Sequence, residues 1–220
     1  MLTESTKTNK DRGRRTHWSA RQLATMALFI AMAVILSFIE FPLIPGIEFL
    51  KYDASAVPAL LMGFSYGPVA GCIVGVLTAI IHALDGNIWG GIMNIGIVIA
   101  FVLPASLVYR FFVKRRLAAS EATPGSLNNT PLPLASSGTG QQLGTSGNIA
   151  LILGLVASCV LMIATAVGMN LVVTPLYMQV PREAVIAMLL PAIIPFNIAK
   201  ALLNSALGFI LLKSLARFIR

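Results

Sequence analysis

Long apolar runs constrain this chain more than any other feature of its sequence. They occupy five stretches: Leu23 to Ile39, Val57 to Ala83, Ile88 to Val108, Ile149 to Val173 and Ile193 to Leu212. A membrane-spanning helix needs about 20 mostly apolar residues. The second run is long enough to require a break, and Gly67-Pro68 supplies one. The runs therefore predict a multi-pass helical membrane protein.

The composition agrees with this class. Of the 220 residues, 57% are hydrophobic and 11% are charged, whereas soluble domains carry about 25% charged residues. The first 21 residues are polar and basic, and the apolar stretch after them is too long for the core of a signal peptide. We expect that stretch to remain as the first transmembrane helix.

The distribution of charge predicts how the chain lies in the membrane. A net charge of +8 could indicate nucleic acid, but the basic residues gather at three places: before the first helix (Lys7, Lys10, Arg12, Arg14, Arg15, Arg21), after the fourth (Arg110, Lys114, Arg115, Arg116) and at the end of the chain (Lys213, Arg217, Arg220). The intervening segments on the other side carry mainly acids: Glu40, Glu48, Asp53, Asp85 and Glu183. Cytoplasmic segments of membrane proteins are enriched in Lys and Arg. The pattern predicts six helices with both termini cytoplasmic and no nucleic-acid partner.

Prolines, glycines and polar segments set the expected boundaries. We expect a basic cytoplasmic tail over residues 1–19 and transmembrane helices 1–4 within residues 20–116. A disordered cytoplasmic linker rich in Ser, Thr, Gly, Pro and Asn follows at 117–147, and helices 5–6 lie within 148–220. The expected helices span about 20–41, 56–67, 68–84, 89–112, 148–173 and 195–215, with a short amphipathic piece at 183–190. Prolines mark several ends because they cannot continue the backbone hydrogen-bond ladder.

Polar residues inside the apolar runs are the candidates for a binding site, because each is costly in the membrane unless it is paired or faces a cavity. Spacings of three and four place Asn197, Lys200 and Asn204 on one helical face. Other polar groups lie toward the same outer side of the membrane: Asn170, Asn94, His82 and the loop residues Glu48, Lys51, Tyr52 and Asp53. The sequence predicts a pocket open to the outside that suits a ligand with carbonyl and hydroxyl groups.

Structural roles compete with this interpretation. An Asn within a membrane helix commonly bonds to a neighbouring helix, and a Lys can extend its side chain to the interface. The structural role is the favoured one for Asn94, Asn204 and His82. A binding role is favoured for Asn197 and Lys200.

The motifs of common enzymes are missing from the sequence. It has no GxxxxGK[ST] phosphate loop and no HExxH, and its two histidines cannot build a zinc protease site. Cys72 and Cys159 lie inside apolar runs, where we expect packing rather than a disulfide or a metal site. We therefore expect no catalytic residues, no metal and no cofactor, although a membrane enzyme that uses acidic residues is left as a rival.

Small residues recur along the first helix. Four alanines follow helical spacing, at Ala20, Ala24, Ala27 and Ala31. Small residues four apart let another helix approach closely. Docking of a partner and packing within the chain were equally compatible with this stripe, whereas Gly71 and Gly75 favour packing within the chain.

Several blocks resemble the riboflavin-specific S components (substrate-binding subunits) of energy-coupling factor (ECF) transporters. They are EFLKYDASAVPA at 48–59, GFSYGP at 63–68, FVLPASLVYR at 101–110, MN at 169–170 with PLY at 175–177, and IPFNIAKALLN at 194–204. The resemblance covers nearly the whole chain except the basic tail and the 117–147 linker.

This resemblance implies a bundle of six helices that captures riboflavin, the transported ligand, on the extracellular side of a bacterial cell membrane. It implies that Asn170, Asn197 and Lys200 hydrogen-bond the flavin, that the loop residues Glu48, Phe49, Leu50 and Lys51 cover it, and that Tyr177 belongs to the same site. It also implies that the alanine stripe docks a transmembrane coupling subunit, while two cytoplasmic ATPase subunits supply energy.

Two departures and several alternatives accompany the resemblance. Family members often carry an acid where this chain has Ala56, and the linker after the fourth helix is unusually long. The rival functions are an S component for another vitamin, such as thiamine or biotin, or for a flavin phosphate, and a facilitator that works without ATPases.

Overall fold

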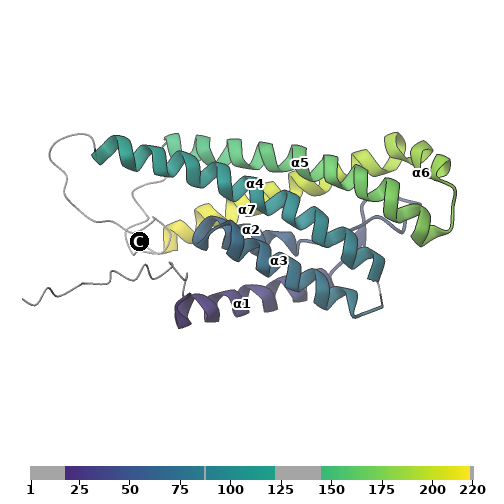
Figure 1. Ribbon diagram of the computed structural model, residues 1–220, viewed down its shortest axis with the longest axis horizontal. Coiled ribbons are helices and arrows are strands. Elements are labelled where there is room, and N and C mark those ends of the chain that lie inside the picture. Colours follow the sequence, from purple (N-terminus) through teal and green to yellow (C-terminus); the bar gives the residue numbers. More distant parts are fainter. Residues whose placement is uncertain (1–17, 87, 122–144, 219–220) are drawn as a thin grey trace, which may run out of the picture.

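The computed structural model describes residues 18–86, 88–121 and 145–218. Most of them lie in helices that form an elongated bundle (Figure 1). The basic tail over residues 1–17 and most of the expected linker, residues 122–144, lie outside the described residues.

The elements follow the expected order with small differences at their ends. They are α1 (Ala20–Ser37), β1 (Phe41–Pro42), β2 (Lys51–Tyr52), α2 (Ala56–Tyr66), α3 (Pro68–Ala83), α4 (Ile88–Glu121), α5 (Thr145–Met178), α6 (Arg182–Met188), the π-helix η2 (Leu189–Ile193) and α7 (Ile194–Phe218). The described edges of the expected linker are helical, because α4 continues to Glu121 and α5 begins at Thr145.

Local chemistry explains where the first three helices begin and end. The Ser19 hydroxyl accepts from the backbone N–H of Gln22, whose side chain accepts from the N–H of Ser19. This reciprocal cap satisfies donors that the first turn of α1 leaves free. Gly67 separates α2 from α3 with a φ of 113°, a conformation that favours glycine.

The last part of the chain differs from the expectation of a helix that begins at Pro195. Here α6, η2 and α7 follow one another without a break, so that helical structure extends from Arg182 to Phe218. Pro191 lies within the π-helix, and Pro195 is the second residue of α7. A π-helical turn is a local irregularity in the α-helical ladder, and here it accommodates a proline that lacks a backbone donor.

Within the part of the chain that the structure describes, four segments are long and apolar enough to cross a membrane: Ala20–Ser37, Ile88–Arg115, Gly147–Met178 and Arg182–Ser214. Two further apolar helices are shorter, Ala56–Tyr66 and Pro68–Ala83. Many large apolar side chains on these helices are exposed, including Leu28, Val160 and Leu202. Such a surface suits lipid rather than water.

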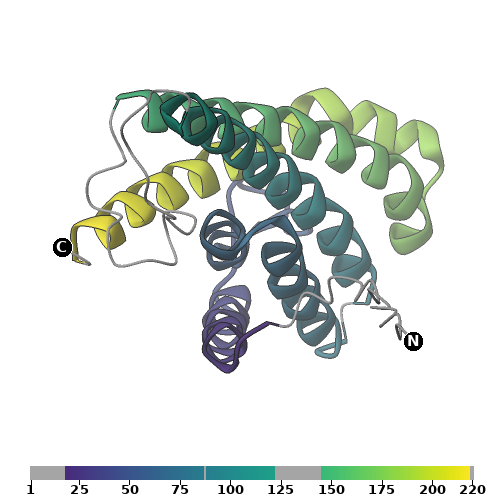
Figure 2. The same cartoon turned by 60° about the vertical axis from the view of Figure 1, so that its left-hand side comes forward.

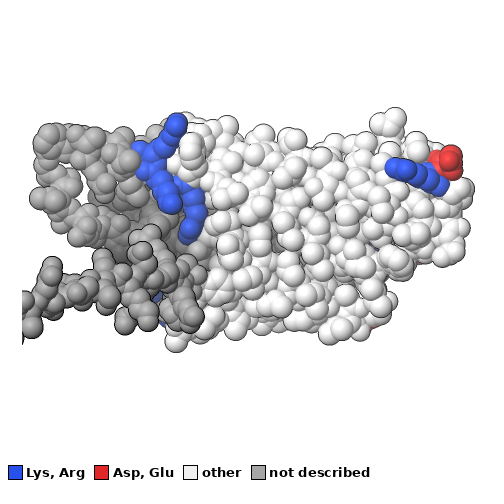
Figure 3. Space-filling view, in the orientation of Figure 1, with Lys and Arg blue, Asp and Glu red and all other residues white. Residues whose placement is uncertain are grey.

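The bundle has two distinct ends. The start of α1, the end of α4 and the end of α7 share one end, while the 38–55 connection and α6 lie at the other (Figure 1). The helix α1 lies at the margin of the bundle, where it packs against α2 and α3 (Figure 2). On the face shown in Figure 3, a basic cluster marks the first end, and neighbouring basic and acidic side chains mark the α6 end.

Candidate functional site at the α6 end of the bundle

The connection between α1 and α2, residues 38–55, brings charged and aromatic side chains to the α6 end. Its strands pair antiparallel, with Phe41 opposite Tyr52 and Pro42 opposite Lys51. The Lys51 ammonium forms an ion pair with Glu40, and the hydrogen bond and charge of Glu40 raise the pKa of Lys51. This pair is largely exposed, so it contributes little to stability.

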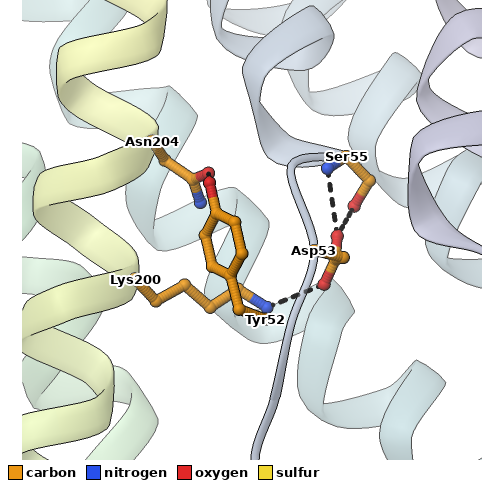
Figure 4. A network of polar contacts seen from close by, with 5 residues as sticks. All are labelled: Tyr52, Asp53, Ser55, Lys200 and Asn204. Carbon is orange, nitrogen blue, oxygen red and sulfur yellow. Dashed lines mark hydrogen bonds and ion pairs between the residues drawn. The ribbon is translucent and has the colours of Figure 1, made fainter. Parts of the chain in front are cut away.

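A buried ion pair joins the same connection to α7. Nζ of Lys200 lies 2.9 Å from Oδ2 of Asp53, and both side chains are less than 10% exposed (Figure 4). The other carboxylate oxygen accepts from the backbone N–H and the hydroxyl of Ser55. Burial alone would raise the pKa of the Asp53 carboxyl, but Lys200 and Ser55 outweigh burial and lower it. The Asp53 carboxylate therefore stays charged in this site.

A second contact between the connection and α7 lies one helical turn away. The Tyr52 hydroxyl donates to Oδ1 of Asn204 over 3.1 Å (Figure 4). Asn204 is completely buried, and its Nδ2 has no hydrogen-bond partner. Through this contact Asn204 ties Tyr52, and with it the 38–55 connection, to α7.

A pocket opens beside the ion pair. Its lining comes from the 38–55 connection and from six helices, and consists of Ser37, Asp53, Ser55, Ala56, Gly75, Thr78, Ala79, His82, Asn94, Ile97, Val98, Phe101, Met162 and Lys200. The space between these residues, its open mouth included, measures about 450 Å³. Because the open mouth accounts for part of that space, we expect the connection to move before a ring-sized ligand can enter.

The structure places the eight expected binding residues in four different settings, the last of which holds Asn170 and Asn197. Lys200 lines the pocket. Phe49 and Leu50 pack in an apolar cluster with Tyr52 of the same connection and with residues of α6, η2 and α7, where Val185, Ala192, Ile193 and Phe196 are buried. Glu48 and Lys51 are exposed, and Tyr177 is 49% exposed near the end of α5. Phe49 and Leu50, two of the loop residues expected to cover the ligand, therefore pack against α6, η2 and the start of α7.

Asn170 and Asn197 are each 2% exposed. Each amide nitrogen donates to a carbonyl four residues earlier in its own helix, Ala166 and Ile193 respectively, over 2.8 Å. Oδ1 of Asn170 also accepts from the Thr174 hydroxyl. Neither residue is among those that line the pocket. Their amide oxygens keep lone pairs that can accept a further hydrogen bond.

Several pocket residues were not expected in a binding role. Ser37 and Thr78 were not singled out, and the structural role was favoured for His82 and Asn94, yet all four line the pocket. A histidine in the last turn of an apolar helix is a signal that could have been given more weight. Nothing local identifies Ser37, since its hydroxyl donates to the carbonyl of Val34 as any helical serine can.

The alanine stripe and the cysteines lie away from this pocket. Ala20, Ala24, Ala27 and Ala31 are all exposed, whereas the buried face of α1 consists of Met26, Ala33 and Ser37. Cys72 and Cys159 are free thiols. Among the described residues, no group of three or more His, Cys, Asp or Glu side chains could hold a metal ion.

The fold and the site together define a multi-pass helical membrane protein with a pocket near one end that is lined by both apolar and polar side chains. The model of the family described as ECF transporter, substrate-specific component, matches residues 21–212. The chain belongs to this family. The assignment confirms the resemblance found in the sequence, and it makes the chain a component of a transporter rather than an enzyme.

Individual relatives support the same assignment. The riboflavin transporter RibU of Staphylococcus aureus (strain TCH60) is 29% identical over 208 residues, which cover 91% of this chain and 93% of the relative. RibU of Lactococcus lactis subsp. cremoris (strain NZ9000) is 30% identical over 112 residues, which cover 48% of this chain and 52% of the relative. The solved S component of a bacterial ECF transporter aligns with a TM-score of 0.66 at 27% identity, over 91% of this chain and 98% of the solved one.

Proposed function

We propose that this chain captures riboflavin at the outer face of a bacterial cell membrane and delivers it inward, working with a transmembrane coupling subunit and two cytoplasmic ATPase subunits. The observation that carries the proposal is the similarity to a riboflavin transporter across 91% of the chain. A pocket that combines apolar lining with a few directed polar groups is typical of small-molecule sites, and this one has both.

We further propose six membrane crossings, formed by α1, α2, α3, α4, α5 and the continuous α6–η2–α7 segment. The two short helices, α2 and α3, each count as one crossing. Arg110, Lys114 and Arg115 lie in the second half of α4, and Lys213 lies in the last two turns of α7. Both helices end at the same end of the bundle (Figure 1). The excess of basic residues there favours a cytoplasmic location, with both termini inside and the pocket near the outside.

In this proposal the polar groups of α5 and α7 recognise the edge of the flavin ring, which carries one N–H between two carbonyl groups. Asn170 and Asn197 offer amide oxygens to the N–H, because their nitrogens already bond to their own helices. Lys200 donates to a ring carbonyl. Phe49 and Leu50 close over the ligand, with Glu48, Lys51 and Tyr177 at the rim.

The Lys200 ammonium already bonds to Asp53, so a ligand that binds to Lys200 must share the ammonium with Asp53. An ammonium group has three donor hydrogens, and Asp53 takes one of them. A carbonyl group of the ligand can accept a hydrogen bond from a second hydrogen of the Lys200 ammonium, and the ion pair with Asp53 stays intact. The neutral ligand then enters beside a charged pair that remains compensated, which avoids the cost of a buried unpaired charge.

The alanine stripe of α1 is proposed as the docking face for the coupling subunit. All four alanines are exposed along one side of a helix at the margin of the bundle. Small side chains let the backbone of a partner helix come close, which favours association of helices in lipid.

The first experiment is to purify the chain from membranes and titrate riboflavin while recording the quenching of its fluorescence. We expect saturable quenching near one ligand per chain. Asn197→Ala is expected to weaken binding about tenfold, since it removes a buried hydrogen-bonding group. Asn148→Ala makes the same change at the start of α5, at the other end of the bundle, and is expected to leave the affinity unchanged. Folded protein that binds no riboflavin would contradict the proposal and direct attention to other vitamins.

A further inference from the structure

His82 presents a buried nitrogen that has no partner. It lies in the last turn of α3, and the residue is 9% exposed. Its ring packs against Phe38 with the ring centroids 5.7 Å apart. Nδ1 is buried and forms no hydrogen bond, although most buried polar groups in proteins have a partner. Since His82 also lines the pocket, a ligand group is the natural candidate for that partner.

The residues that line the pocket near His82 share one chemical character. Ser37, Thr78 and Asn94 are small polar side chains without charge. The hydroxyls of Ser37 and Thr78 donate to the carbonyls of Val34 and Val74, each in its own helix, so their oxygens remain able to accept. This part of the pocket comes from α1, α3 and α4, whereas Lys200 reaches it from α7.

Hydroxyl groups fit this environment better than any part of a flavin ring does. A hydroxyl donates one hydrogen bond and accepts others, so it can pair with Nδ1 whichever ring nitrogen of a neutral histidine carries the proton. The oxygens of Ser37 and Thr78 can each accept a further hydrogen bond, which a second hydroxyl supplies. The methylated benzenoid side of the ring has neither donors nor acceptors and would leave Nδ1 of His82 unpaired, at a cost in affinity.

We propose that the α1–α3–α4 side of the pocket binds the ribityl chain of the ligand, and that His82 is the specificity-determining residue that recognises one of its hydroxyls. This inference rests on the proposed function and adds to it the orientation of the ligand in the pocket. The polar edge of the ring points toward α5 and α7, and the sugar-alcohol chain points toward α3. Phe101 and Met162 supply apolar lining for the ring.

A purely structural role for His82 makes a different prediction. If the imidazole only packs against Phe38, its replacement changes the binding of every flavin to the same extent. Lumiflavin separates the two roles, because it keeps the ring system of riboflavin and carries a methyl group in place of the ribityl chain. Its affinity also reports whether a variant is folded.

The experiment measures riboflavin and lumiflavin affinities for the purified wild-type chain, His82→Phe and His82→Gln. We expect His82→Phe, which keeps an aromatic ring beside Phe38, to bind riboflavin roughly five- to tenfold more weakly and lumiflavin within about twofold of wild type. His82→Gln, which keeps a hydrogen-bonding group, is expected to retain more riboflavin affinity than His82→Phe. The matched control is Ile81→Phe, which places the same side chain one residue earlier, where Ile81 is 38% exposed.

The outcomes are distinguishable. If His82→Phe weakens both flavins equally, or neither, the subsite is wrong while the proposed function stands. If the wild-type chain binds lumiflavin as tightly as riboflavin, the ribityl chain makes no productive contact and the subsite is again wrong. If the wild-type chain binds neither flavin, the proposed function fails and the inference falls with it.

Discussion

The pocket and the helix contacts beneath it are held together in different ways. Around the pocket, side chains from distant parts of the chain meet through polar pairs, of which Asp53–Lys200 and Tyr52–Asn204 are the buried examples (Figure 4). Elsewhere, glycines let backbones touch. A Cβ on Gly71 would lie 2.7 Å from the Ala59 carbonyl oxygen, and a Cβ on Gly154 would lie 2.7 Å from that of Ala105.

This difference separates a part that can rearrange from a part that cannot. Backbone contacts in α2–α3 and α4–α5 have no side chain that could move aside, so they fix the spacing of the helices. Polar pairs can exchange partners with a ligand at small net cost, provided that each group stays bonded. We infer that the glycine contacts provide a rigid frame on which the 38–55 connection moves.

The largest effect is expected from breaking the ion pair on one side only. Lys200→Met leaves the Asp53 carboxylate buried without its counter-charge, which should lower the free energy of unfolding by about 3–5 kcal/mol. Adding Asp53→Asn removes that charge and should recover most of the loss, while riboflavin binding stays weak because Lys200 is still missing. Chemical unfolding of the detergent-solubilised variants measures the first effect and fluorescence quenching the second. If Lys200→Met alone is as stable as wild type, the ion pair contributes nothing to the free energy of unfolding.

A smaller effect is expected in the rigid frame. Gly71→Ala places a methyl group against backbone atoms of Ala59 and Gly63, so we expect a loss of about 1–3 kcal/mol in the free energy of unfolding. Gly168→Ala is the matched control, because nothing lies within 4 Å of a Cβ there and alanine is the better helix former. Equal stability of the two variants would refute the idea of a close-packed frame.

The smallest effect on stability is expected on the exposed face of α1. Replacing Ala27 and Ala31 with Leu should change the free energy of unfolding by less than about 0.5 kcal/mol, because both residues are exposed. Riboflavin binding should also persist, whereas uptake by cells that contain the coupling subunits should fall at least roughly tenfold if the stripe is a docking face. Met32→Phe adds bulk on another exposed part of the same helix and should spare uptake. Normal uptake by the double variant would leave the stripe without a docking role.

The positions of the helices could be read from the sequence because they depend on each segment by itself. The length of an apolar run, a capping serine such as Ser19 and a break such as Gly67 act within a few residues. The polar face of α7 could be predicted from the sequence for the same reason, since helical spacing alone aligns Asn197, Lys200 and Asn204. The continuity of α6 with α7 could not, because the prolines at 191 and 195 suggested a stop that a π-helical turn removes.

The pairing of the polar side chains was decided only by the tertiary structure. Asp53 and Lys200 are 147 residues apart in the chain, and whether they meet depends on how α7 is rotated and where the 38–55 connection folds back. A structural role was expected for His82, and only the tertiary structure shows that Phe38 packs against its ring and that Ser37 and Asn94 line a pocket together with it. The cost of placing a polar group in lipid acts on each segment separately, so the sequence determined which segments are helices and which residues needed partners. The partners themselves come from the rotation and packing of helices far apart in the chain, which only the folded structure fixes.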